Sequence, residues 1–262
     1  MRLTRLNHDS SWLVELHGTR ILLDPWLLGP SVVAVPFVHR AVLGQPTVPV
    51  EALPAADAIL LSHPYPDHTN AATLRHLDRR LPVLAGPIAL ALARLLGGFT
   101  NGVRLGDRSF GGAATPFGRV SISYCRAGRF DPTHNVYLLR GLDSGESLLY
   151  CPHSMFPTGP AMDAVVADSG GKVDVLLTAF DLLDLPFYLG GIAKLGQEAS
   201  VALVERFRPS LVLRTHDGEK PDTGFISRVQ RWVYCTDVPR LLGTGVRYAE
   251  PPLAVPLDTR AA

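Results

Sequence analysis

Residues 62–68 have the sequence Ser62-His63-Pro64-Tyr65-Pro66-Asp67-His68, which places two histidines and an aspartate in a turn stiffened by two prolines. The apolar run Asp57–Ser62 predicts a buried strand, and Thr69 or Asn70 can cap a helix that we expect to continue to about Leu81. Metal sites need several donors on a rigid backbone, which a stiff loop at a strand end supplies. Plain surface loops can have the same composition, so this segment alone does not separate the two interpretations.

Three other histidines lie next to predicted strands: His134 before Asn135–Leu139, His153 after Ser147–Cys151 and His216 after Leu211–Arg214. Asp24 closes a further predicted strand, Thr19–Leu23. In layered α/β proteins the strand ends at one edge line a common crevice. We therefore expect these side chains to meet residues 62–68 in one site.

The predicted elements alternate between strand-rich and mixed segments. Short runs rich in valine, isoleucine and leucine dominate the beginning and the middle of the chain, while helices follow strands elsewhere, as at Gln197–Phe207 and Gly224–Val233. Two such halves, each with its own sheet, bury the sheets against each other and leave the helices outside. We therefore predict an α/β fold, a four-layer αββα sandwich, in a single domain over residues 1–262.

Residues 26–56 do not fit this alternation. Prolines recur at positions 30, 36, 46, 49 and 54, among large apolar residues such as Trp26 and Phe37. Proline at this density disfavours a long helix or an inner strand. We expect an ordered loop or short helix-turn segment that either packs on the edge of the core or forms a wall or lid over a substrate.

The composition limits the class of protein. Hydrophobic residues make up 47% and charged residues 19% of the chain, with a net charge of +1, so a sizeable core is expected and nothing favours nucleic acid as a partner. Cys125, Cys151 and Cys235 are isolated and are interpreted as buried apolar residues. No signal core or membrane-spanning run occurs, so we expect a cytoplasmic protein. The near-neutral charge and the apolar segment 26–56 favour a small-molecule substrate over a polynucleotide. The oligomeric state stays open.

The segment 62–68 resembles the H-x-H-x-D-H signature of the metallo-β-lactamase superfamily. Residues 6–15 and 18–26 resemble the start of its lactonase-like and phosphodiesterase-like branches, and the resemblance extends over nearly the whole chain. It implies that Asp67, His68 and His216 bind one metal ion. It also implies that Asp24 accepts a hydrogen bond from a ligand histidine and fixes its orientation.

Three positions depart from the superfamily pattern. Tyr65 occupies the place of the second signature histidine, no histidine occurs at 125–129, where a third is expected, and His153 stands where the superfamily has a metal-bridging aspartate. A neutral imidazole does not hold two cations together as a carboxylate does, and a phenol is a poor donor unless it is ionised. His134 can substitute for the missing histidine, although it lies several residues late. The combination resembles a divergent bacterial and plant branch.

We therefore expect one well-made metal site with four donors, from Asp67, His68, His153 and His216. Three nitrogens and one oxygen suit Zn²⁺, with iron and manganese as alternatives. His63 and His134 are candidates for a weaker second ion. Tyr65 and His8 are candidates to line the pocket.

The leading functional hypothesis is a metal-dependent hydrolase of a small ester, lactone, amide or phosphodiester, in which a metal activates water and Asp67 or His153 carries the proton. One alternative is a non-hydrolytic oxidoreductase or isomerase, which redox-active iron would indicate. The other is a non-catalytic protein with a degenerate metal site, which the changes at Tyr65 and His153 favour.

Overall fold

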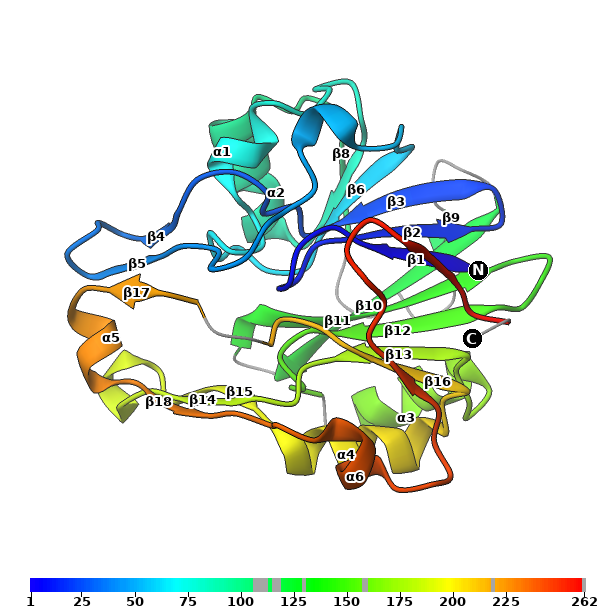
Figure 1. The fold of residues 1–262 in the computed structure, drawn as a ribbon. Coiled ribbons are helices and arrows are strands. Elements are labelled where there is room, and N and C mark those ends of the chain that lie inside the picture. Colours follow the sequence, from blue (N-terminus) through cyan, green and yellow to red (C-terminus); the bar gives the residue numbers. More distant parts are fainter. Residues whose placement is uncertain (106–112, 115–118, 129–130, 157–159, 218–219, 261–262) are drawn as a thin grey trace.

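The computed structural model describes residues 1–105, 113–114, 119–128, 131–156, 160–217 and 220–260. In these residues the strands form two seven-stranded sheets and two three-stranded sheets. Figure 1 shows the two large sheets face to face, with helices on the outer side of each. The predicted four-layer αββα sandwich is therefore confirmed.

The first large sheet contains strands from the beginning of the chain and one from its end. Its order is β20 (Pro256–Asp258), β1 (Arg2–Arg5), β2 (Trp12–Leu16), β3 (Thr19–Leu23), β6 (Ala58–Leu61), β7 (Val83–Ala85) and β8 (Gly102–Arg104). Its outer face is covered by α1 (Ala71–Leu74), α2 (Pro87–Leu92) and the π-helical turn Ala93–Gly97.

The second large sheet comes from the later part of the chain. Its order is β19 (Tyr248–Ala249), β16 (Leu211–Arg214), β13 (Val175–Thr178), β12 (Ser147–Cys151), β11 (Asp131–Gly141), β10 (Val120–Gly128) and β9 (Ala113–Ala114). The helices on its outer side are α3 (Pro160–Ser169), α4 (Gln197–Phe207) and α6 (Val238–Leu242). Helix α4 and strand β16 have the predicted bounds.

Three apolar clusters fill the spaces between the four layers. Leu60 and Leu177 belong to the cluster between the sheets, whereas their neighbours Leu61 and Leu176 belong to the two clusters beneath the helices. Successive side chains of a strand point to opposite faces, so a strand covered on both sides is apolar throughout. All three cysteines are buried and free, as predicted. No helix in the ranges above is long and apolar enough to cross a membrane.

Two helices are shorter than predicted. Asn70 caps α1, accepting a hydrogen bond from Thr73 N at 2.9 Å, but the helix ends at Leu74 and does not reach Leu81. Downstream, Asp78 Oδ1 accepts a hydrogen bond from Arg80 N at 3.0 Å, a local turn that competes with helix.

Near the other end of the chain, α5 spans only Phe225–Val229, and residues 231–233 form a strand where we predicted helix. This strand, β18 (Arg231–Val233), pairs antiparallel with β14 (Leu182–Asp184), which also pairs with β15 (Ile192–Leu195). Tryptophan and valine fit well in strands, and β14 offers these residues a pairing partner. The pairing with β14 therefore outweighs the local helical pattern.

Residues 26–56, where we predicted an ordered loop or short helix-turn segment, contain two short strands and a turn: β4 (Ser31–Val33), β5 (His39–Ala41) and the 3₁₀ turn Val50–Ala52. Strand β5 also pairs with β17 (Asp222–Thr223), which completes a small sheet. Figure 1 shows this sheet and the sheet β15-β14-β18 projecting from the same side of the sandwich. Strands of two or three residues are too short to show a periodic pattern.

Candidate metal centre

The predicted site residues gather where strands of both large sheets end. Residues 62–68 follow β6, and Asp24 follows β3, which runs parallel to β6. His153 follows β12 and His216 follows β16, and both of these strands run parallel to β13 between them. Strand β11 is antiparallel to β12, so His134 near its beginning lies at the same edge. The strand directions therefore bring together residues that are far apart in the sequence.

Five buried histidine rings contact one another at this edge. Their ring centroids are separated by 4.2 Å for His63 and His153, 4.6 Å for His68 and His216, and 4.8 Å for His134 and His153. These are the five histidines that the sequence placed at strand ends.

Three of the imidazoles are held through Nδ1 by an oxygen atom: His68 by Asp24 Oδ2 at 2.7 Å, His153 by Ala193 O at 2.8 Å and His216 by Asp9 Oδ1 at 2.9 Å. Carbonyl and carboxylate oxygens only accept, so each Nδ1 donates its proton. The Nε2 atom of a neutral ring then carries a lone pair. Such anchoring fixes ring orientation and is typical of metal-binding histidines.

The donor atoms converge closely enough to share an ion. His68 Nε2 lies 3.1 Å from His153 Nε2, and two lone pairs at this distance repel each other unless a proton or metal ion is present. The donor atoms form two groups, and within each group all of them lie within 4.8 Å of one another. One group is His63, His68 and His153, and the other is Asp67, His68 and His216. Zn–N bonds of 2.0–2.1 Å place tetrahedral ligand atoms about 3.3 Å apart. This donor set therefore fits a divalent metal ion.

The protein environment keeps two of these rings neutral. Burial lowers the pKa of His153 well below its usual value, and His216, His134 and His68 nearby lower it further. Burial also lowers the pKa of His216, together with the ammonium groups of Lys220 and Lys194. Neutral imidazole is the form that binds metals.

His68 behaves differently because carboxylates lie around it. Burial alone would lower its pKa, but the charges of Asp24, Asp67 and Asp9 and the hydrogen bond with Asp24 together raise it. The carboxylates around His68 therefore favour positive charge at this ring.

His63 is more firmly bonded to protein atoms. Ser62 Oγ donates to Asp24 Oδ2 and accepts from His63 Nδ1 at 2.7 Å, while His63 Nε2 accepts from Asn135 N at 3.3 Å. Burial lowers the pKa of His63 well below its usual value, with further lowering by the neighbouring histidines. An ion at His63 Nε2 has to compete with the Asn135 amide.

The remaining predicted residues lie at the margin. Tyr65 stacks on His63 with ring centroids 6.3 Å apart, and its hydroxyl donates to Thr133 Oγ1 at 3.3 Å. In the described part of the chain, neither His134 nor His8 belongs to the two convergent donor groups. His8 is half-buried, and burial lowers its pKa.

Asp9 was not predicted from the sequence, although it contacts His216 as Asp24 contacts His68. A weak signal was present, because Asp9 lies in the short polar stretch between strands β1 and β2. Lys194 and Lys220, which also lie beside His216, have no local sequence pattern that marks them.

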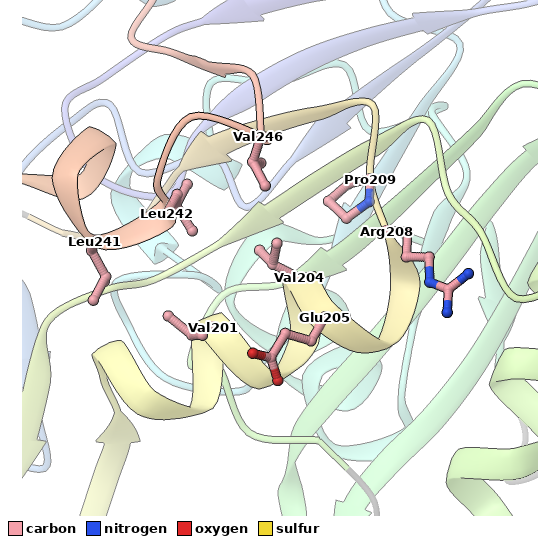
Figure 2. Close-up of a pocket in the computed structure, with 9 residues that line it drawn as sticks. Val201, Val204, Glu205, Arg208, Pro209, Leu241, Leu242 and Val246 are labelled. Atoms are coloured by element: carbon pink, nitrogen blue, oxygen red, sulfur yellow. The ribbon is translucent and has the colours of Figure 1, made fainter.

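A separate hollow lies in the outer helix layer, between α4 and the segment around α6 (Figure 2). Its volume is about 430 Å³, and its lining combines apolar side chains such as Val204 and Leu241 with the charged Glu205 and Arg208. None of the clustered histidines lines it, so it is distinct from the candidate metal centre.

Comparison with known families finds a family that matches most of the chain. A family model described as the beta-lactamase superfamily domain matches residues 2–216. The chain belongs to the metallo-β-lactamase superfamily. The resemblance to this superfamily that residues 62–68 carry is therefore confirmed. No curated protein matches the chain by sequence.

Several solved structures share the fold with this chain at low sequence identity. An isothiocyanate hydrolase from Delia radicum gut bacteria is 17% identical with a TM-score of 0.65, over 84% of this chain and 86% of that one. A protein described as a possible metal-dependent hydrolase from Veillonella parvula is 12% identical with a TM-score of 0.68, over 98% of each chain. CmlA, a diiron β-hydroxylase from Streptomyces venezuelae, is 18% identical with a TM-score of 0.58, over 82% of this chain and 44% of that one.

Proposed function

We propose that this protein is a metal-dependent hydrolase of a small ester, lactone, amide or phosphodiester. The observation that supports this most directly is the convergence of His68 Nε2 with His153 Nε2, His216 and Asp67, of which the three histidines are buried. A divalent ion held by these residues would supply a lowered pKa of water and polarisation of a scissile carbonyl or phosphoryl group.

The proposed ligands are His68, His153, His216 and Asp67, with Zn²⁺ as the preferred ion. His68 belongs to both donor groups, and its Nδ1 is already bonded to Asp24, so it offers one nitrogen only. The two groups therefore compete for the same ligand atom, which favours one ion per chain. His63 and His134 could then support only a weaker second ion.

Asp67 is the proposed proton carrier. Its side chain is 24% exposed, and its Oδ2 lies 3.8 Å from His216 Nε2, so it faces both the ligands and solvent. A carboxylate in this place can accept a proton at Oδ and release it to bulk water. His153 can take this role if its Nε2 is not engaged as a ligand, since Ala193 O fixes the proton on its Nδ1.

The proposal is tested by elemental analysis of protein purified without added metal or chelator. We expect about one zinc ion per chain, lost in His68→Ala and in His216→Ala. A panel of small esters, lactones, amides and phosphodiesters then identifies the substrate class, with the two variants as inactive controls. A folded wild-type protein that binds no added Zn²⁺ would contradict the proposal and favour a non-catalytic role.

A second candidate is a metal-dependent oxidoreductase. It is favoured by the group His63, His68 and His153, whose three imidazoles suit iron as well as zinc. Iron as the main metal in the same measurement, without hydrolysis of any substrate in the panel, would support this candidate instead.

A further inference from the structure

Lysine is rare in this chain, and its distribution is uneven. The sequence contains lysine only at positions 172, 194 and 220. Lys172 is exposed, whereas the side chain of Lys194 is 1% exposed and that of Lys220 is 10% exposed. Buried lysines need partners for their charge. The buried Lys194 and the largely buried Lys220 both have such partners around His216.

Lys220 contacts the aspartate that holds His216. Its Nζ lies 2.5 Å from Asp9 Oδ1, and the same oxygen accepts from His216 Nδ1 at 2.9 Å. Lys220 Nζ is also 3.5 Å from His216 Nδ1. One carboxylate oxygen is therefore shared between an ammonium group and the imidazole of a proposed ligand.

The Asp9 carboxylate depends on this contact for charge compensation. Its side chain is 2% exposed, and among the described residues its Oδ2 has no hydrogen-bond partner. Removing one partner of a buried ion pair leaves a charge without compensation, which is strongly unfavourable. Without the Lys220 ammonium, the Asp9 carboxylate is expected to turn away from His216.

Lys194 holds the backbone on the other side of the same histidine. Its Nζ donates to His216 O and lies 3.4 Å from Asp217 Oδ1. His216 has a φ of 55°, in the left-handed region that non-glycine residues seldom adopt, so its backbone needs such support. The ring of Trp232 lies 5.0 Å from Lys194 Nζ and 6.0 Å from Lys220 Nζ, within cation–π distance of both.

We propose that Lys220 is a positioning residue of the metal centre, which acts through Asp9 to keep His216 Nε2 directed at the ion. The inference rests on the proposed metal-dependent function. It also gives the small sheets a role, because Lys220 lies two residues before β17 and Trp232 belongs to β18. These segments support the centre from outside the two large sheets.

The test measures Zn²⁺ affinity by competition with a chromophoric chelator, which requires no substrate. Lys220→Met keeps most of the apolar stem and removes the charge, and we expect about 10- to 100-fold weaker binding. Lys172→Met is the matched control, because Lys172 is exposed and should leave affinity unchanged. An unchanged affinity in Lys220→Met would overturn the inference.

A double-mutant cycle shows whether Lys220 acts through Asp9. In an Asp9→Asn background the acidic partner is gone, so Lys220→Met should then change affinity by less than about twofold. An equally large loss in both backgrounds would indicate a general structural role and would overturn the inference.

If circular dichroism shows that Lys220→Met does not fold without metal, the Zn²⁺ affinity of Lys220→Arg tests the inference instead. This variant retains the charge, and an affinity within about threefold of wild type supports positioning by charge, whereas a loss above about tenfold overturns it. A wild-type protein that binds no Zn²⁺ would instead refute the proposed function itself.

Discussion

Asp24 is the most heavily bonded side chain of the candidate centre. Its Oδ1 accepts from Ser62 N at 2.6 Å, and its Oδ2 accepts from Ser62 Oγ, from His68 Nδ1 at 2.7 Å and from Tyr150 Oη at 2.6 Å. Its backbone φ of 39° is positive, which aspartate tolerates better than most residues. The Asp24 carboxylate thus connects the end of β3 with residues 62–68 and with Tyr150 of β12.

Replacing this carboxylate should weaken metal binding. In Asp24→Asn the charge that favours His68 Nδ1–H is lost, and we expect Zn²⁺ affinity to fall by about 10- to 100-fold, measured by chelator competition. The control is Asp143→Asn, whose side chain is 67% exposed. Equal affinity of Asp24→Asn and wild type would show that Asp24 does not orient a ligand.

The histidine pKa shifts predict how the stability of the chelator-treated protein depends on pH. The pKa values of His63, His153 and His216 are lowered in the folded state from the usual 6.5, so below about pH 6.5 the unfolded state binds more protons. Stability should therefore fall as pH falls, by up to about 1.4 kcal/mol per pH unit for each group.

The pKa of His68 shifts in the opposite direction, so its contribution to stability has the opposite dependence on pH. Its folded-state pKa is raised, so its contribution is fully present below about pH 6.5 and is lost as pH rises through the folded value. The combined contribution of these four histidines to the free energy of unfolding should therefore be largest near neutral pH. Urea unfolding at several pH values measures it. His153→Gln should flatten the decline on the acidic side, and an unchanged slope would contradict this account.

Among the elements, the segment before α5 depends on a glycine. Gly224 has a φ of 111°, and a Cβ atom at this position would lie 2.7 Å from Val38 O. The backbone bonds Phe225 N to Phe37 O at 2.9 Å and Ile226 N to Val38 O at 3.0 Å hold α5 against the β4–β5 loop. The close approach and the left-handed conformation both require glycine.

Gly224→Ala should therefore destabilise the protein by about 1–3 kcal/mol, because the backbone has to shift or adopt a strained conformation. The measurement is urea unfolding of the variant beside Gly245→Ala, where an added Cβ meets no atom within 4 Å. Equal stability of the two variants would show that the close approach to Val38 O does not require glycine at position 224.

At the scale of the whole molecule, the proposed ligands come from both halves of the sandwich. His68 and Asp67 follow a strand of the first sheet, whereas His153 and His216 follow strands of the second. An ion held by these residues links the ends of the two sheets. Metal binding should therefore stabilise the folded state as a whole.

Added Zn²⁺ should accordingly raise the melting temperature. At a free concentration about 100 times the dissociation constant, the stabilisation is about 2.7 kcal/mol, which corresponds to several degrees. Differential scanning calorimetry of wild type and His216→Ala is the measurement, and the variant should show a much smaller shift. An equal shift in both proteins would place the ion elsewhere.

The sequence predicted a large part of the fold and of the candidate centre. Strands such as Leu211–Arg214 are continuous apolar runs because both of their faces are buried, and such runs are visible without a structure. The donors at positions 63, 67, 68, 134, 153 and 216 all lie in or beside predicted loops at strand ends. The principle that strand ends share an edge was enough to expect them together.

Predictions from local patterns were wrong where contacts with distant segments determine the conformation. Residues 231–233 form a strand because β14 offers a pairing partner almost 50 residues earlier in the chain. Asp9 and Lys220 were not recognised because their role exists only when segments 211 residues apart meet.

The sequence by itself determined the alternation of strands and helices, the superfamily and the residue types available to bind a metal, because these depend on local periodicity and short motifs. Only the tertiary structure decided which nitrogen of each histidine faces the centre and which pKa values rise or fall. Proton positions and pKa values depend on oxygens and charges within a few ångströms, and those neighbours are supplied by other strands.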